Sequence, residues 1–212
     1  MSVPRLRVLL VGASGVIGRW VHQALADDCE VIAAGLDDPQ HRVDLASTDS
    51  IESMLRAVTV EGGPLDAVIS AAGRARFVRL SDIDAADSGQ SAYTLGLHDK
   101  LMGQVNLALA ARAVLKPGGV IVLTTGTTSR EPIIGGSSLS MVNGALECWV
   151  RAAATELGNG LRLNAVSPSL VEGTPAAACA AFPGFPTVSG AHVALAYLRC
   201  LRSGLTGQVL SA

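Results

Sequence analysis

Three glycines near the amino terminus have the spacing of a turn that could bind a diphosphate. They lie in the run from Val11 to Gly18, between an apolar run and an amphipathic segment. In this G-x-x-G-x-x-G spacing, Gly12 permits a tight turn, Gly15 lets the backbone approach phosphate, and Gly18 allows close packing. A helix beginning here would offer free N–H groups and its positive dipole end to phosphate. The pattern predicts a dinucleotide-binding turn, with a plain strand-to-helix turn as the alternative.

The residues that follow the second apolar run, 30–34, bear on which dinucleotide would fit. Asp37 and Asp38 come shortly after that run. A carboxylate here accepts a hydrogen bond from the free ribose hydroxyl of NAD, whereas a basic residue favours the 2′-phosphate of NADP. The acids therefore favour NAD over NADP. Two alternatives stay open, because Arg19 and Arg42 could reach a phosphate and the two acids could form an exposed turn.

Apolar runs and amphipathic segments alternate along the chain and would position these residues. Strands are expected over residues 7–11, 30–34, 65–70, 120–124 and 161–166, with an edge strand at 208–210. Helices are expected over 15–26, 47–57, 94–115, 138–157 and 192–201, and 172–189 is the expected flexible loop. The alternation predicts an α/β fold, a Rossmann-like doubly wound parallel sheet in three α/β/α layers, as a single domain over residues 1–212. Such sheets bind ligands at the carboxyl ends of their strands.

The composition argues against several classes of protein. The chain has 212 residues, of which 49% are hydrophobic, 16% charged and 3% aromatic, with a net charge of −2. This charge argues against a nucleic-acid partner, and no apolar stretch reaches the roughly 18–20 residues of a membrane span. The four cysteines lack the spacing of metal ligands, so no metal site is expected. With no signal-peptide pattern at the amino terminus, the chain is expected to be cytoplasmic with reduced thiols.

Several motifs, in order, resemble those of the short-chain dehydrogenase/reductase family. The glycine-rich turn matches the family's cofactor loop, although Val11 stands where threonine is usual. Asp44-Leu45 matches the pair beside adenine, and residues 70–73 resemble an Asn-Asn-Ala-Gly motif that has lost both asparagines. Residues 162–169 resemble the strand that leads to the nicotinamide of a bound NAD or NADP. The resemblance implies these cofactor-binding residues: Gly12, Ser14, Gly15, Val16, Ile17, Gly18, Asp44, Leu45, Ala71, Ala72, Gly73, Lys100, Thr124, Pro168, Val171 and Thr174.

The catalytic pair of that family is absent from this chain. The family places a tyrosine and a lysine four residues apart on one helix, where the lysine lowers the pKa of the tyrosine that transfers the proton. Alignment of residues 143–147 with the family's run puts Leu139 at the tyrosine position and Asn143 at the lysine position. Neither side chain transfers a proton near neutral pH. The two tyrosines, Tyr93 and Tyr197, are each followed four residues later by leucine, so no shift of register restores the motif.

Lys100 is the candidate to replace the lost groups, since it aligns with the family's active-site asparagine on the preceding helix. It could hold the nicotinamide ribose, or donate a proton if burial depresses its pKa; the alternative is an exposed helix lysine. The family's serine role falls on Thr124 or Thr125, and Thr125 would bind the substrate oxygen. Asn143 could bind a ligand, with core or capping roles as alternatives. The candidate catalytic residues are therefore Thr125, Lys100 and Asn143.

Three functions remain open at this point. The first is an NAD(P)-dependent oxidoreductase with a non-standard active site, acting on a small carbonyl compound or alcohol. The second is a non-redox protein that binds a dinucleotide or another small molecule on the same scaffold. The third is an isomerase or dehydratase that uses the emptied pocket. A short branch of the family, with the same run in place of the catalytic motif, resembles the chain most, and the family resemblance implies a homo-oligomer.

Overall fold

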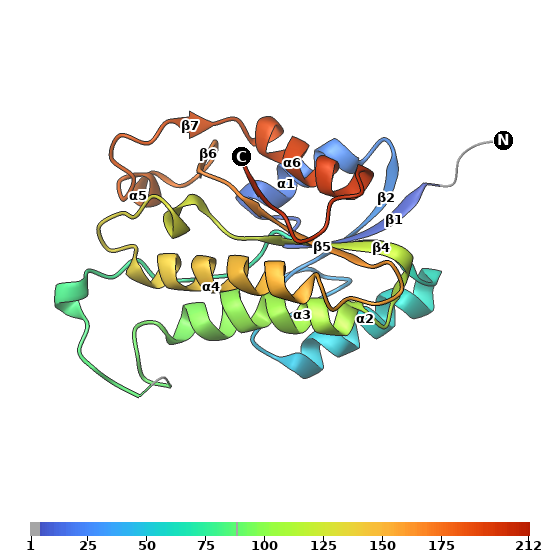
Figure 1. The fold of residues 1–212 in the computed structure, drawn as a ribbon, viewed down its shortest axis with the longest axis horizontal. Helices are drawn as coiled ribbons and strands as arrows, with labels where there is room; N and C mark the ends of the chain where they lie inside the picture. The colour runs from blue at the N-terminus through green and yellow to red at the C-terminus, as the bar shows by residue number, and fades with distance from the viewer. Residues whose placement is uncertain (1–4, 88) are drawn as a thin grey trace.

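A parallel β-sheet between two layers of helices forms the centre of the molecule (Figure 1). The computed structural model describes residues 5–87 and 89–212; the first four residues, where no signal-peptide pattern was found, lie outside the described part. The six strands of the sheet lie in the order β2-β1-β3-β4-β5-β8. Their bounds are β1 Leu6–Val11, β2 Cys29–Ala34, β3 Leu65–Ser70, β4 Leu115–Thr124, β5 Arg162–Ser167 and β8 Val209–Ser211. The predicted doubly wound α/β fold is confirmed.

Strand β1 lies at the point where the direction of winding reverses. It pairs in parallel with β2 on one side and with β3 on the other. Its residues 8–11 are almost completely buried, as expected for a strand covered on both faces. In an open α/β sheet, ligands bind at the carboxyl ends of the strands beside such a reversal. The glycine-rich turn begins directly after β1, so it lies at that place.

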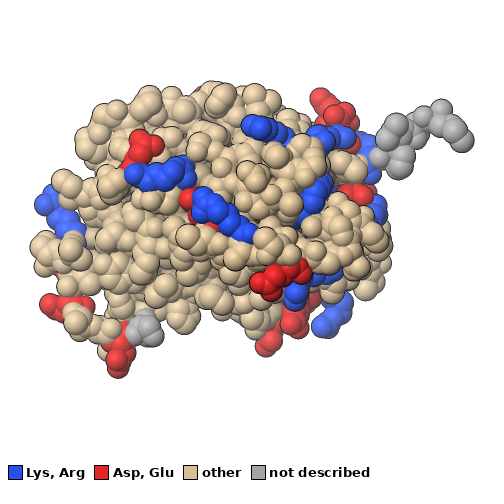
Figure 2. Space-filling view, in the orientation of Figure 1, with Lys and Arg blue, Asp and Glu red and all other residues tan. Residues whose placement is uncertain are grey.

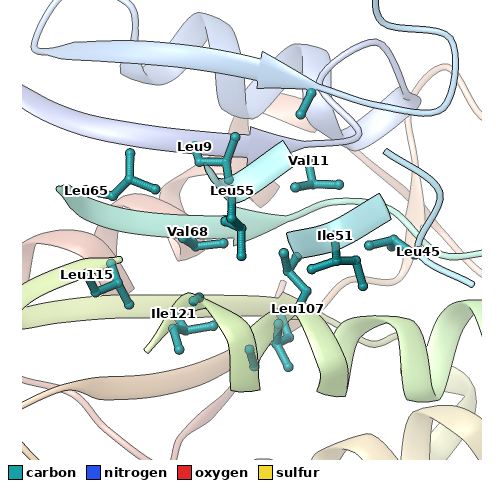
Figure 3. Packing of buried hydrophobic residues seen from close by; sticks show 14 of the residues in the cluster. Leu9, Val11, Leu45, Ile51, Leu55, Leu65, Val68, Leu107, Leu115 and Ile121 are labelled. Carbon is teal, nitrogen blue, oxygen red and sulfur yellow. The ribbon is translucent and has the colours of Figure 1, made fainter. Parts of the chain in front are cut away.

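Helices cover both faces of the sheet. Helices α1 (Val16–Leu25) and α6 (Gly190–Arg202) pack together on one face, over a core cluster that includes Val8, Leu10 and Tyr197. The opposite face is covered by α2, α3 and α4, and Figure 3 shows the leucine, isoleucine and valine side chains between these helices and the strands. The bounds are α2 Thr48–Gly62, α3 Gly103–Ala111 and α4 Ser137–Ala153. A π-helical segment, η2 (Gly96–Met102), leads directly into α3.

The helix expected over 94–115 ends earlier than predicted, because long-range pairing outweighs the local helical pattern. Helix α3 ends at Ala111, and Leu115 instead begins β4, paired with Leu65 of β3. The ammonium of Lys116 lies 2.8 Å from a carboxylate oxygen of Asp66. The register between β3 and β4 shifts directly after the Leu65–Leu115 pair, and this shift accommodates the Pro-Gly-Gly run at 117–119 inside the strand. A helix stop was expected at that run.

The remaining differences concern the ends of elements. Ser47 caps α2 as predicted, since its hydroxyl accepts a hydrogen bond from the Ser50 amide, but the helix runs on to Gly62. The expected flexible loop over 172–189 contains a short helix and a strand that pairs with residues just before the loop. Short elements complete the fold: η1 Leu80–Asp82, η3 Thr127–Ser129, β6 Leu170–Val171, α5 Ala176–Cys179 and β7 Thr187–Val188.

The described surface is mixed in charge. On the face shown in Figure 2, basic and acidic side chains are interspersed on a largely uncharged surface. Across residues 5–87 and 89–212, no helix combines the length and the apolar character needed to cross a membrane. Within the same residues, no group of three or more His, Cys, Asp or Glu side chains is arranged to hold a metal ion.

Candidate functional site

The glycine-rich turn after β1 has no room for side chains at two positions. Gly12 has φ +83°, and a Cβ there would lie 2.9 Å from the Ala71 carbonyl group. A Cβ at Gly18 would lie 2.0 Å from the Gly12 carbonyl oxygen, so this glycine lets α1 pack against the turn. Helix α1 begins at Val16, and the first N–H groups of a helix lack intrahelical partners. The turn therefore presents backbone donors to the cleft above β1.

The cleft has two halves, named here the adenosine half and the nicotinamide half after the cofactor parts that the family resemblance implies beside their residues. The adenosine half has a volume of about 330 Å³. Both members of the Asp44-Leu45 pair line it, together with Asp37 from the segment after β2. Asp38 serves the turn instead, because its carboxylate accepts hydrogen bonds from the amides of Gln40 and His41, at 3.0 and 2.8 Å. Of the sequence-predicted cofactor residues, this half brings together Gly12, Ser14, Gly15, Asp44, Leu45, Ala71, Ala72 and Gly73.

An ion pair in the adenosine half was not expected from the sequence. Arg74, which directly follows Gly73, donates its amide and two guanidinium N–H groups to the buried carboxylate of Asp99, at 2.5 to 2.9 Å. The guanidinium pKa is raised by this hydrogen bond and by the charge of Asp99. Arg19 and Arg42, the alternatives considered from sequence, do not line this half. The pair joins residues 25 positions apart, so no local pattern could have indicated it.

The second half of the cleft, the nicotinamide half, has a volume of about 350 Å³ and meets the first at Gly73. Leu139 and Asn143 of α4, the two residues aligned from sequence with the catalytic pair, both line it, one helical turn apart. The other predicted residues that line this half are Val16, Ile17, Gly73, Lys100, Thr125, Pro168, Val171 and Thr174. Leu139 therefore presents a hydrocarbon side chain to this cavity.

Lys100 extends from η2 into the nicotinamide half. Its side chain packs on Gly73, where a Cβ would lie 2.9 Å from the lysine Cγ. Its ammonium lies 3.5 Å from the carbonyl oxygens of Thr124 and Thr125, which are long contacts. Burial lowers the pKa of Lys100 to about 8, an effect opposed in part by the charge of neighbouring Asp99. An exposed helix lysine, the alternative from sequence, does not describe this residue.

The side chains of Asn143 and Thr125 differ in whether a polar atom is left without a hydrogen-bond partner. Asn143 is 2% exposed; its amide nitrogen donates to the Thr128 hydroxyl at 2.9 Å, while its buried carbonyl oxygen has no protein partner. The Thr125 hydroxyl instead donates to the Glu147 carboxylate at 3.1 Å. The same carboxylate oxygen accepts bonds from Ser129, Arg130 and Ser167. Glu147 thus ties together the ends of β4 and β5 below the cavity, a role that only its position on the buried stripe of α4 could have suggested.

Some of the predicted residues lie outside both cavity walls. The Thr124 hydroxyl contacts the Ser70 carbonyl and the Tyr197 hydroxyl, so its side chain is held away from the cleft. Tyr197 is completely buried, and burial raises its pKa. The Tyr93 hydroxyl lies 3.2 Å from that of Ser137. Neither tyrosine is among the described residues that line the two halves of the cleft.

Known proteins share both the sequence pattern and the fold. A family model described as "Enoyl-(Acyl carrier protein) reductase" matches residues 12–202. Over 179 residues the chain is 26% identical to "Granaticin polyketide synthase putative ketoacyl reductase 2" of Streptomyces violaceoruber, covering 77% of this chain and 72% of that one. It is 32% identical over 147 residues to "Short-chain dehydrogenase/reductase ATR9" of Stachybotrys chlorohalonatus (strain IBT 40285), covering 69% of this chain and 55% of that one.

Solved structures extend the similarity over almost the whole chain. The protein lin1944 from Listeria innocua is 34% identical with a TM-score of 0.89, over 98% of this chain and 99% of that one. A small-chain dehydrogenase in complex with NADPH is 24% identical with a TM-score of 0.83, over 99% and 97% of the two chains, and so shares the fold. Together with the glycine-rich turn, the cleft and the family match, these similarities show that the chain belongs to the short-chain dehydrogenase/reductase family of oxidoreductases.

Proposed function

We propose that this chain is an NAD(P)-dependent oxidoreductase that acts on a small carbonyl compound or alcohol without a tyrosine acid. The observation that carries the proposal is the arrangement of the nicotinamide half, where Leu139 takes the tyrosine position and Lys100 supplies the one charged side chain among the described lining residues. A desolvated lysine in such a cavity can exchange a proton near neutral pH. Loss of the tyrosine acid is expected to make turnover slower than in relatives that keep it, because acid catalysis contributes roughly 10²–10⁴-fold.

The residues of the cleft fit a dinucleotide. A side chain at Gly12 or Gly18 would fill the turn, and the first N–H groups of α1 are suited to bind the pyrophosphate. In the nicotinamide half, the unpartnered Asn143 carbonyl can accept a ribose hydroxyl, and the Lys100 ammonium can donate to one. Asp37 would accept the free ribose hydroxyl of the adenosine, which favours NAD over NADP. A bound nicotinamide dinucleotide supplies or accepts the hydride.

Lys100 and Thr125 would contact the substrate oxygen, whereas Asn143 would hold the cofactor. In reduction, the Lys100 ammonium donates a proton to the oxygen, directly or through one water molecule. The Thr125 hydroxyl donates its own proton to Glu147, so its oxygen can accept a hydrogen bond from the hydroxyl of an alcohol substrate. Asn143 fixes the position of the reacting groups through its free carbonyl. With a pKa of about 8, Lys100 is mostly protonated at pH 7, so reduction slows as the pH rises through 8, whereas oxidation gains.

A binding assay followed by an activity assay tests the proposal. Thermal unfolding is measured with NAD, NADH, NADP and NADPH; a ligand at about 100 times its dissociation constant adds roughly 2.7 kcal/mol of stability. Nicotinamide absorbance is then followed with a panel of ketones and aldehydes, for the wild type and Lys100→Met. We expect stabilisation, slow turnover and loss of turnover in the variant. No shift with any dinucleotide would refute the proposal, and binding without turnover would favour the non-redox alternative.

The domain organisation and the oligomeric state of the chain are also expectations. We propose that residues 1–212 act as one domain that assembles into a homo-oligomer, which the family resemblance supports. Sedimentation of the purified protein tests this expectation: a monomer at micromolar concentration would contradict it.

A further inference from the structure

All three phenylalanines of the chain gather at one place, beside the nicotinamide half of the cleft. The ring of Phe77, in the segment after β3, lies edge-to-face with that of Phe182, with 6.0 Å between centroids and 80° between planes. Phe182 makes a similar contact with Phe185, at 5.4 Å and 84°. Phe77 and Phe182 also line the cavity, and Phe185 does not. Two segments about a hundred residues apart thus bring their aromatic rings to the wall of one cavity.

The packing of the core does not explain this cluster. Both buried clusters consist mainly of leucine, isoleucine, valine and alanine, and no phenylalanine occurs among their members in the described residues. Phe77 is 42% exposed, although burial of a phenylalanine ring is favourable by roughly 1.5–3 kcal/mol. Exposed apolar groups that gather at a concave site are typical of ligand-binding walls. The rings therefore have an arrangement that suits a ligand better than it suits folding.

The wall of the same cavity carries both polar and apolar side chains. Lys100 comes from η2, Thr125 directly follows β4, and Asn143 comes from α4. Phe77 and Phe182 come from the segments that follow β3 and α5. Leu139 and Ala178 add further apolar surface. Among the described lining residues, Lys100 is the one charged side chain. A substrate that directs its oxygen to Lys100 would therefore direct the rest of its structure to aromatic and aliphatic walls.

We propose that the substrate is an uncharged aryl ketone or the matching aryl alcohol, with its ring against Phe77 and Phe182. This inference rests on the proposed function, because the oxygen of the substrate is assigned to Lys100. A charged group on the ring would be desolvated against these walls without a partner. Reduction adds one hydride from the reduced dinucleotide to the carbonyl carbon and one proton to the oxygen, giving a secondary alcohol and the oxidised dinucleotide.

Three ketones of similar size test the chemistry of the walls. Acetophenone has the aryl ring, cyclohexyl methyl ketone has a saturated ring, and 4-acetylbenzoate adds a carboxylate at the far end. Calorimetry measures their binding to the protein saturated with NAD⁺, in which a ketone cannot be reduced. We expect acetophenone to bind roughly 3- to 10-fold more tightly than the cyclohexyl ketone, the range that aromatic pairs provide. We expect 4-acetylbenzoate to bind at least about tenfold more weakly than acetophenone.

Two matched variants test whether the preference for an aryl ring arises at the cavity wall. Phe182→Leu keeps an apolar side chain on the cavity wall, and we expect it to abolish the preference for acetophenone over the cyclohexyl ketone. Phe185→Leu changes a ring of the same cluster that does not line the cavity, and should keep the preference. Equal binding of the two neutral ketones, or tightest binding of 4-acetylbenzoate, would overturn the inference. If no dinucleotide binds, the proposed function fails, and the same ketone series on the free protein still decides whether the rings select an aryl group.

Discussion

Replacement of Lys100 by methionine is expected to stabilise the protein while removing its activity. The folded protein keeps the Lys100 ammonium in a desolvated site, which lowers its pKa from 10.5 to about 8. A difference of that size corresponds to at most about 3.4 kcal/mol of folding free energy at pH 7. Contact of the side chain with the open cleft reduces this figure, so we expect Lys100→Met to gain about 1–2 kcal/mol, or roughly 2–8 °C in melting temperature.

The pH dependence of this gain identifies its cause. The folded-state pKa lies below the unfolded-state pKa, so between about pH 8 and 10.5 the unfolded chain holds more protons and the stability of the wild type rises with pH. The advantage of Lys100→Met is therefore full below pH 8 and shrinks by more than half near pH 10. Urea unfolding of wild type and variant at pH 7 and pH 10 measures both values, and the difference between them cancels the titration of other groups.

The second lysine of the chain provides the control. Lys116 is half-exposed and paired with Asp66, so Lys116→Met should lose up to about 1 kcal/mol, the opposite sign. A less stable Lys100→Met protein at pH 7, or a gain that does not change with pH, would refute the argument that Lys100 is a desolvated cation. In the activity assay, Lys100→Met should lose at least roughly 10²-fold in turnover, the smallest factor that a general acid contributes.

Three further variants test other parts of the cleft. Gly18→Ala places a Cβ 2.0 Å from the Gly12 carbonyl oxygen, so we expect the variant to lose about 1–3 kcal/mol of stability and to lose NADH binding. A variant that melts and binds NADH like the wild type would contradict this. Asp37→Ala should weaken NAD binding roughly tenfold and leave NADP affinity equal or higher, as measured by titration of both. Asn143→Leu should weaken NADH binding. Its stability should change by less than about 1 kcal/mol, because removal of the unpartnered carbonyl offsets the lost bond to Thr128. An unchanged affinity for NADH would argue against the ribose contact.

The sequence predicted the sheet and the glycine-rich turn well, because both depend on local signals. Buried parallel strands are short apolar runs, and all six appear within five residues of their expected starts. The end of the helix over 94–115 was wrong for the opposite reason. Leu115 continues an apolar pattern compatible with a helix, and only its pairing with Leu65 assigns it to β4. Such pairing depends on residues 50 positions away, which a local pattern does not contain.

The candidate site was predicted in part. Alignment of the α4 run indicated the positions of Leu139 and Asn143, which do line the cavity, because helical periodicity fixes which side chains share a face. Thr124 was expected to face the cofactor, but strand alternation turns adjacent side chains to opposite sides, and its hydroxyl contacts Tyr197 instead. The Arg74–Asp99 pair, like the phenylalanine cluster, forms between distant segments and was not expected.

The π-helical segment η2 connects the two halves of the cleft. Asp99 and Lys100 are neighbours in that segment, yet Asp99 lines the adenosine half and Lys100 the nicotinamide half, on either side of Gly73. Asp99 binds Arg74 and at the same time opposes the desolvation that lowers the pKa of Lys100. Wide turns of this kind are often found at functional sites. One local irregularity in the helix before α3 thus places one charged side chain in each half of the cleft.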